Sequence, residues 1–61
     1  MITQIANILV DEAGLPGTIA VALARRLASA DSMEAIRALL ETELDIGEVL
    51  ELLPEIAAIV L

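Results

Sequence analysis

The chain contains no aromatic residue, although 59% of its 61 residues are hydrophobic. Its core must therefore be built from Leu, Ile, Val, Met and Ala side chains, which favour helices that approach closely with small residues between them. No segment alternates strictly between apolar and polar residues, as a half-exposed strand would, and helix-forming residues dominate. The sequence predicts an all-α fold: a compact bundle of four to five short helices in a single domain, residues 1–61.

Turn and capping signals divide the chain into five expected helices. Gly14, followed by an apolar residue and Pro16, matches a Schellman-type stop in which Leu15 folds back onto Val10. Pro54 should kink the last helical run or start a new helix with Pro54 at its first position, because a proline in a helix interior removes a hydrogen bond and costs about 3 kcal/mol or more. The expected helices span residues 3–13, 16–28 with Pro16 at the first position (or 18–28 with Thr18 as the N-cap), 32–43, 46–53 and 55–61.

Two D-x-x-E motifs, Asp31–Glu34 and Asp45–Glu48, each precede a helical run. In both we expect the aspartate to accept a hydrogen bond from the third backbone N–H that follows it, as in a capping box. Leu44 and Val49 can add a hydrophobic staple at the second motif. The eleven-residue segments that contain these motifs share four residues at equal offsets, which a common need for capping explains as well as a duplication does.

Helical periodicity assigns the expected core. The second helix is apolar almost all round, so it should be the central and most buried element. In the other helices the expected core residues are Ile2, Ile5, Ala6, Leu9 and Ala13, then Met33, Ile36, Leu39 and Leu40, then Ile46, Val49, Leu50 and Leu53. The apolar segment 56–61 should pack against its own chain or another.

The net charge of −7 is unevenly distributed. Residues 1–30 sum to zero, whereas residues 31–61 carry eight acids and a single base, Arg37. Such a surface repels phosphate groups, so we expect no nucleic acid partner, and binding to anionic membranes is disfavoured. For the same reason we reject a helix-turn-helix in which residues 33–43 read DNA.

No segment is suited to crossing a membrane. The longest stretch without a charge, residues 13–24, is 12 residues long and is broken by glycine and proline. A spanning helix needs about 20 apolar residues. No basic segment precedes an apolar run at the start of the sequence. We therefore expect a soluble protein with neither a transmembrane segment nor a secretory signal.

Few residues could carry chemistry, because the chain has no His, Cys or Lys. It therefore lacks a base that titrates near neutral pH, a thiolate, an amine nucleophile and the usual zinc and haem ligands. Glu48, Glu51 and Glu55 line one helical face and form the one candidate acid–base group, but a solvated acidic face explains them without any activity. We predict that the protein is not an enzyme and has no catalytic, cofactor-binding or metal-binding residue.

The remaining polar residues have structural interpretations. Residues 41–45 lack the spacing of an EF-hand loop, so calcium binding there is disfavoured. Ser29 and Ser32 have no base to activate them and flank a helix junction, where we expect them to act as caps. Arg25 and Arg26 complement the dipole of the second helix, or could form a salt bridge with an acidic face of another subunit.

The apolar surplus is larger than a lone small bundle can hide, so we expect a homo-oligomer, a dimer or larger, whose partner is itself. The narrow set of residue types and the repeated capping motifs are typical of a designed or structural assembly protein. A small acidic adaptor that binds a partner helix in a groove is an alternative. Symmetric contacts through the second helix and the C-terminal segment would cover the most apolar surface.

One resemblance suggests a further alternative. The aliphatic, alanine-rich chain of four or five short helices has apolar ends, Met1-Ile2 and Ile59-Val60-Leu61, that could meet inside one helix. In this it resembles the circular bacteriocins, membrane-active peptides with a compact saposin-like bundle, and the resemblance implies a membrane-active peptide. The chain departs from that family in its strongly acidic surface and its lack of lysine and aromatic residues.

Overall fold

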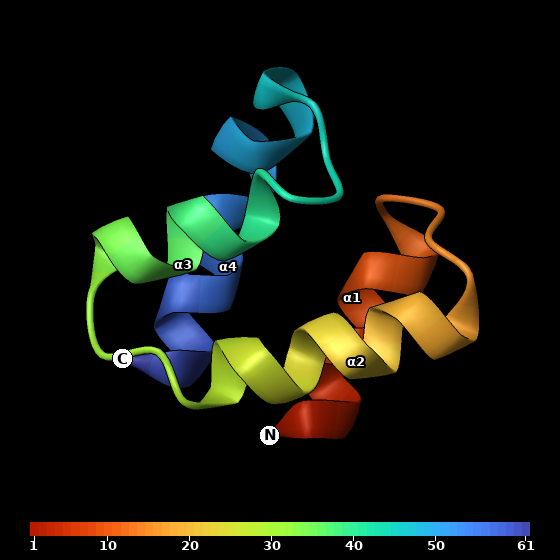
Figure 1. Ribbon diagram of the computed structural model, residues 1–61, viewed down its shortest axis with the longest axis horizontal. Helices are drawn as coiled ribbons and strands as arrows, with labels where there is room; N and C mark the ends of the chain where they lie inside the picture. Colours follow the sequence, from red (N-terminus) through yellow and green to blue (C-terminus); the bar gives the residue numbers. More distant parts are fainter.

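The computed structural model describes residues 1–61 and contains four helices and no strand, which confirms the all-α fold. Helix α1 packs against α2, helix α3 packs against α4, and contacts between α2 and α3 join the two pairs (Figure 1). The Cα radius of gyration is 9.8 Å, close to the roughly 10.5 Å expected of a compact chain of this length. The helices are α1 (Ile2–Asp11), α2 (Gly17–Ala28), α3 (Met33–Leu40) and α4 (Ile46–Val60).

The core consists of aliphatic side chains alone, and no polar or charged side chain is buried. Three of its members, Ala6, Ala20 and Ala24, belong to the α1–α2 pair, as expected of helices that approach closely. The 14 buried residues are Ile5, Ala6, Leu9, Ala20, Leu23, Ala24, Leu27, Ile36, Leu40, Leu44, Val49, Leu52, Ile56 and Ala57.

The predicted start of a new helix at Pro54 is wrong, because α4 continues through this residue to Val60. Two features of the site allow this. Pro54 is exposed, so the bend that its ring imposes can curve the helix around the core, with the convex side toward solvent. The carbonyl of Leu50, which loses its usual N–H partner, belongs to an exposed residue that water can reach. Residues 46–53 and 55–61 are therefore one helix.

One of the two predicted aspartate caps is confirmed and the other is wrong. Asp45 caps α4, and its Oδ1 accepts a hydrogen bond from the N–H of Glu48 at 2.9 Å. At α3 the cap is Ser32 instead of Asp31: the Ser32 hydroxyl accepts from the N–H of Ala35 at 3.1 Å. Serine at the position immediately before the helix competes better than an aspartate one residue farther away.

The first two helices have no side-chain caps. Pro16 is the N-cap residue of α2, so neither predicted start, with Pro16 inside the helix or with Thr18 as the cap, is correct. Between α1 and α2, Gly14 has φ +69° and its N–H donates to the carbonyl of Val10 at 3.1 Å. This is an αL termination, not the predicted Schellman pair. The N–H of Leu15 donates to the carbonyl of Leu9 at 3.1 Å.

The predicted core is correct in α1 and shifted in α4. Ile5, Ala6 and Leu9 are buried as expected, although Ile2 is exposed and Ala13 is half-buried beyond the end of the helix. In the second half Met33, Ile46 and Leu50 are exposed, contrary to prediction, whereas Leu52, which the prediction omitted, is 2% exposed. The continuous α4 carries its buried face through residues 49, 52 and 56. Helix α2 contacts both α1 and α3, but several of its residues, including Ile19 and Val21, remain exposed.

Candidate interaction surfaces

An apolar surface lies on the outer side of α4. The helix buries Val49, Leu52 and Ile56, and the residues on its opposite side face solvent. Spacings of four and three residues place these exposed positions on one helical face. We define the α4 stripe as the exposed residues Ile46, Leu50, Pro54, Ala58 and Leu61. Its three large side chains are more than half exposed: Ile46 at 52%, Leu50 at 57% and Leu61 at 59%.

Carboxylates border the α4 stripe. Glu51 and Glu55 are exposed beside it on α4, and the fold brings Glu12, which follows α1, close to Glu55. The pKa of Glu12 is raised above its ordinary value, first because its carboxyl group can share a proton with that of Glu55. Lost hydration and the negative charges of Glu55, Glu51 and Asp11 act in the same direction. This edge of the stripe is therefore strongly acidic and carries no cation that compensates it.

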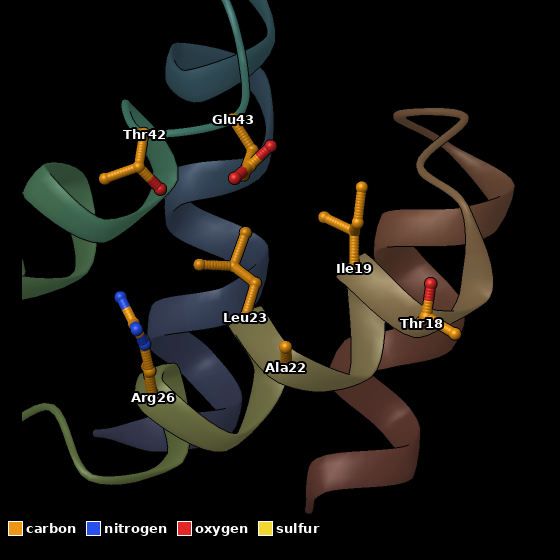
Figure 2. Close-up of a pocket in the computed structure, with 7 residues that line it drawn as sticks. All are labelled: Thr18, Ile19, Ala22, Leu23, Arg26, Thr42 and Glu43. Atoms are coloured by element: carbon orange, nitrogen blue, oxygen red, sulfur yellow. The ribbon is translucent and has the colours of Figure 1, made fainter.

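A second surface is a groove between α2 and the α3–α4 loop, with a volume of about 280 Å³. Figure 2 shows Ile19 and Leu23 pointing from α2 toward the loop that carries Thr42 and Glu43. We call this feature the α2 groove, and its lining residues are Thr18, Ile19, Ala22, Leu23, Arg26, Thr42 and Glu43. It is smaller than most pockets that enclose a small molecule, so an open docking surface describes it better than a ligand cavity.

The arginines differ in their partners. Nε of Arg37 lies 3.7 Å from Oε2 of Glu41, one turn away in an exposed i,i+4 pair. Arg25 and Arg26 occupy the last turn of α2, where cations complement the helix dipole as predicted, and neither makes an ion pair within the chain. Arg26 is the one cation that lines the α2 groove.

The acid–base candidates lie together, but no base joins them. Glu48 is half-buried at the start of α4, whereas Glu51 and Glu55 face solvent. Sequence reasoning missed Glu12, because only the tertiary fold brings the end of α1 near the middle of α4. No local sequence pattern could indicate this contact, because at least 39 residues separate Glu12 from Glu51 and Glu55 in the sequence.

The other candidate residues have structural partners. In residues 41–45, Glu41 pairs with Arg37, the Thr42 hydroxyl donates to the carbonyl of Leu39 at 2.7 Å, and Asp45 caps α4. No group of three or more acidic side chains is arranged to hold a metal ion. Ser29 is the C-cap residue of α2 and Ser32 the N-cap of α3, as their interpretation as caps predicts.

Comparison with known proteins identifies no relative of this chain. The sequence matches no protein-family model, and no curated protein or solved structure is significantly similar to it. None of the four helices combines the length and apolar character needed to cross a bilayer.

Proposed function

We propose that this protein has no catalytic function and acts as a small self-associating helical bundle, a homo-oligomer of two or more chains. The α4 stripe is the observation that carries this proposal. Its three large side chains are each more than half exposed and lie on one helical face. Covering such a face with a second surface removes apolar area from water, which is the main driving force of association.

The total accessible surface is ordinary for a chain of this size, but the hydrophobic side chains exposed on it support the proposal. The chain exposes 3552 Å², close to the roughly 3,800 Å² expected of a compact monomer of this mass. Nine large hydrophobic side chains nevertheless remain exposed, even though the C-terminal residues Ile56 and Ala57 pack in the chain's own core. The fold thus hides as much surface as its size allows, and the apolar residues left over are available to a partner.

Light scattering and thermal melts from micromolar to millimolar concentration test this proposal. Self-association predicts a mass above that of one chain and a melting temperature that rises with concentration. A mass of one chain throughout, with a melting temperature independent of concentration, would contradict it. Leu50→Asp is the suitable disrupting variant, because Leu50 is exposed. Ile59→Asp is unsuitable, since Ile59 packs against the core and its loss would also weaken the fold.

The acidic edge of the α4 stripe favours a second candidate function, an acidic adaptor that binds a basic amphipathic helix. Glu12, Glu51 and Glu55 would pair with cations beside the apolar contact. Titration with an arginine-bearing amphipathic peptide tests this, with a glutamate-bearing peptide of the same apolar face as the control. The adaptor function predicts saturable binding of the basic peptide alone, and equal binding or no binding of the two peptides contradicts it.

A further inference from the structure

We infer that the chains assemble by docking the α4 stripe of one copy in the α2 groove of another. This inference rests on the proposed self-association and names the two surfaces that meet. Both surfaces are exposed, both carry aliphatic side chains, and they belong to different helices of the same chain. The contact therefore joins unlike surfaces.

Charge complementarity selects this pairing. The α4 stripe is bordered by Glu51 and Glu55 and has no cation beside it. The two arginines without an ion pair in the chain are on α2, and one of them, Arg26, lines the groove. A stripe placed in the groove of a second copy brings its carboxylates toward this guanidinium, in a setting that contact with aliphatic side chains partly dehydrates.

Pairing of like surfaces has the opposite electrostatics. Two α4 stripes placed face to face would bring Glu51 and Glu55 of both copies together, in a region where the charges already repel one another within one chain. Two α2 grooves placed together would gain no net attraction between their charges, because each is lined by one cation, Arg26, and one carboxylate, Glu43. Docking the stripe in the groove avoids the repulsion between two stripes, and it also covers the exposed side of Ile19 and Ala22 with the large side chains of the stripe.

The α2 groove contains one residue that opposes this docking. Glu43 lines the wall across from α2 and adds a negative charge to the site that would receive the acidic edge. Glu43→Gln should therefore strengthen association, whereas Arg26→Glu should weaken it. Both residues are exposed, so neither substitution removes a core contact.

A mixing experiment tests the pairing of unlike surfaces. Leu50→Asp inactivates the stripe and Arg26→Glu inactivates the groove, and each should lower the association constant by about 30-fold or more, the effect of losing an anchor residue. Each variant keeps one intact surface. An equimolar mixture should therefore form a one-to-one pair that neither variant forms alone. Val21→Asp is the matched control, because Val21 is an exposed aliphatic residue of α2 outside the groove.

Sedimentation and light scattering read the masses, and circular dichroism verifies that each variant is folded. If Leu50→Asp loses helicity, Ala58→Gln replaces it as the stripe variant, since Ala58 is exposed on the same face. Monomeric single variants, a mixed pair and an unaffected Val21→Asp support the inference. An associating wild type whose variants still associate, or whose mixture stays monomeric, overturns the docking and leaves self-association intact. A monomeric wild type overturns both proposals.

Discussion

The two halves of this chain, residues 1–30 and 31–61, form and end their helices in different ways. In the first half, α1 and α2 have no side-chain cap, their acids and bases cancel, and three buried alanines belong to the pair. In the second half, a serine caps α3, an aspartate caps α4, and the whole net charge of the chain resides there. Packing and a glycine turn define the first pair, whereas local hydrogen bonds fix where the second pair begins.

This difference has a functional consequence. In the second half, α4 is longer than α3 and keeps one apolar face uncovered. Arg25 and Arg26 remain unpaired on α2, whereas the carboxylates of Glu12, Glu51 and Glu55 repel one another where the end of α1 meets α4. The two arginines and the acidic edge of the α4 stripe are thus complementary charges that the fold of a single chain leaves unsatisfied.

The largest expected effect tests which face of α4 belongs to the core. Leu52→Ala should destabilise the fold by about 2–5 kcal/mol, because it removes a buried side chain and leaves a cavity. Leu50→Ala should cost well under 1 kcal/mol in a dilute sample, since Leu50 is largely exposed. Urea midpoints at low protein concentration measure both. Equal losses of stability for the two variants would show that α4 turns a different face toward the core.

A glycine-to-alanine substitution should change the stability of the fold in opposite directions in the two halves. Gly14→Ala should cost about 1–2 kcal/mol, because Gly14 has φ +69° and a Cβ atom disfavours that conformation. Gly47→Ala should stabilise the fold by about 0.5–1 kcal/mol, because alanine favours a helix and its Cβ would lie 3.5 Å from Oδ1 of Asp45, an ordinary contact. Thermal melts of both variants check this. A cost at Gly47 similar to that at Gly14 would contradict the comparison.

The helix content and the core of α1 could be predicted from sequence, because residue types, glycine and helical spacing act locally. The path of α4 could not. Whether Pro54 ends a helix depends on which side of the helix faces the core, and helical spacing alone also placed Leu50 in the core and left Leu52 out of it. The lack of conventional catalytic residues followed from composition, but the α2 groove and the meeting of Glu12 with Glu55 are tertiary features that no local pattern encodes.

Replacing a candidate cap residue by alanine should lower the stability of the fold only in the second half of the chain. Ser32→Ala and Asp45→Ala should each destabilise by about 0.5–2 kcal/mol, because each leaves a backbone N–H without its acceptor. Asp31→Ala and Thr18→Ala are the matched controls: both residues were candidate caps in the sequence, and neither accepts a capping hydrogen bond. Chemical denaturation at one protein concentration measures all four. A cost at Thr18 equal to that at Ser32 would remove the distinction between the halves.

The smallest expected effect is the pH dependence of the acidic edge. The pKa of Glu12 is raised in the folded state, so its contribution to stability is fully present below its ordinary pKa and is lost as the pH rises through the raised value. Glu12→Gln should therefore raise the melting temperature at neutral pH, with the gain shrinking toward acid pH, where the wild-type carboxyl group is protonated as well. Dilute samples isolate this effect from association.

Glu34→Gln removes the same charge from the first turn of α3, where a negative charge interacts favourably with the helix dipole, so it should lower the melting temperature at neutral pH. If both substitutions raised the melting temperature, the cause would be general repulsion among the carboxylates of the chain and not a local cluster at Glu12. If the α4 stripe docks as inferred, an arginine of the neighbouring chain offsets the repulsion at this edge. The advantage of Glu12→Gln should then decrease as the protein concentration rises, which links the charge difference between the halves to assembly.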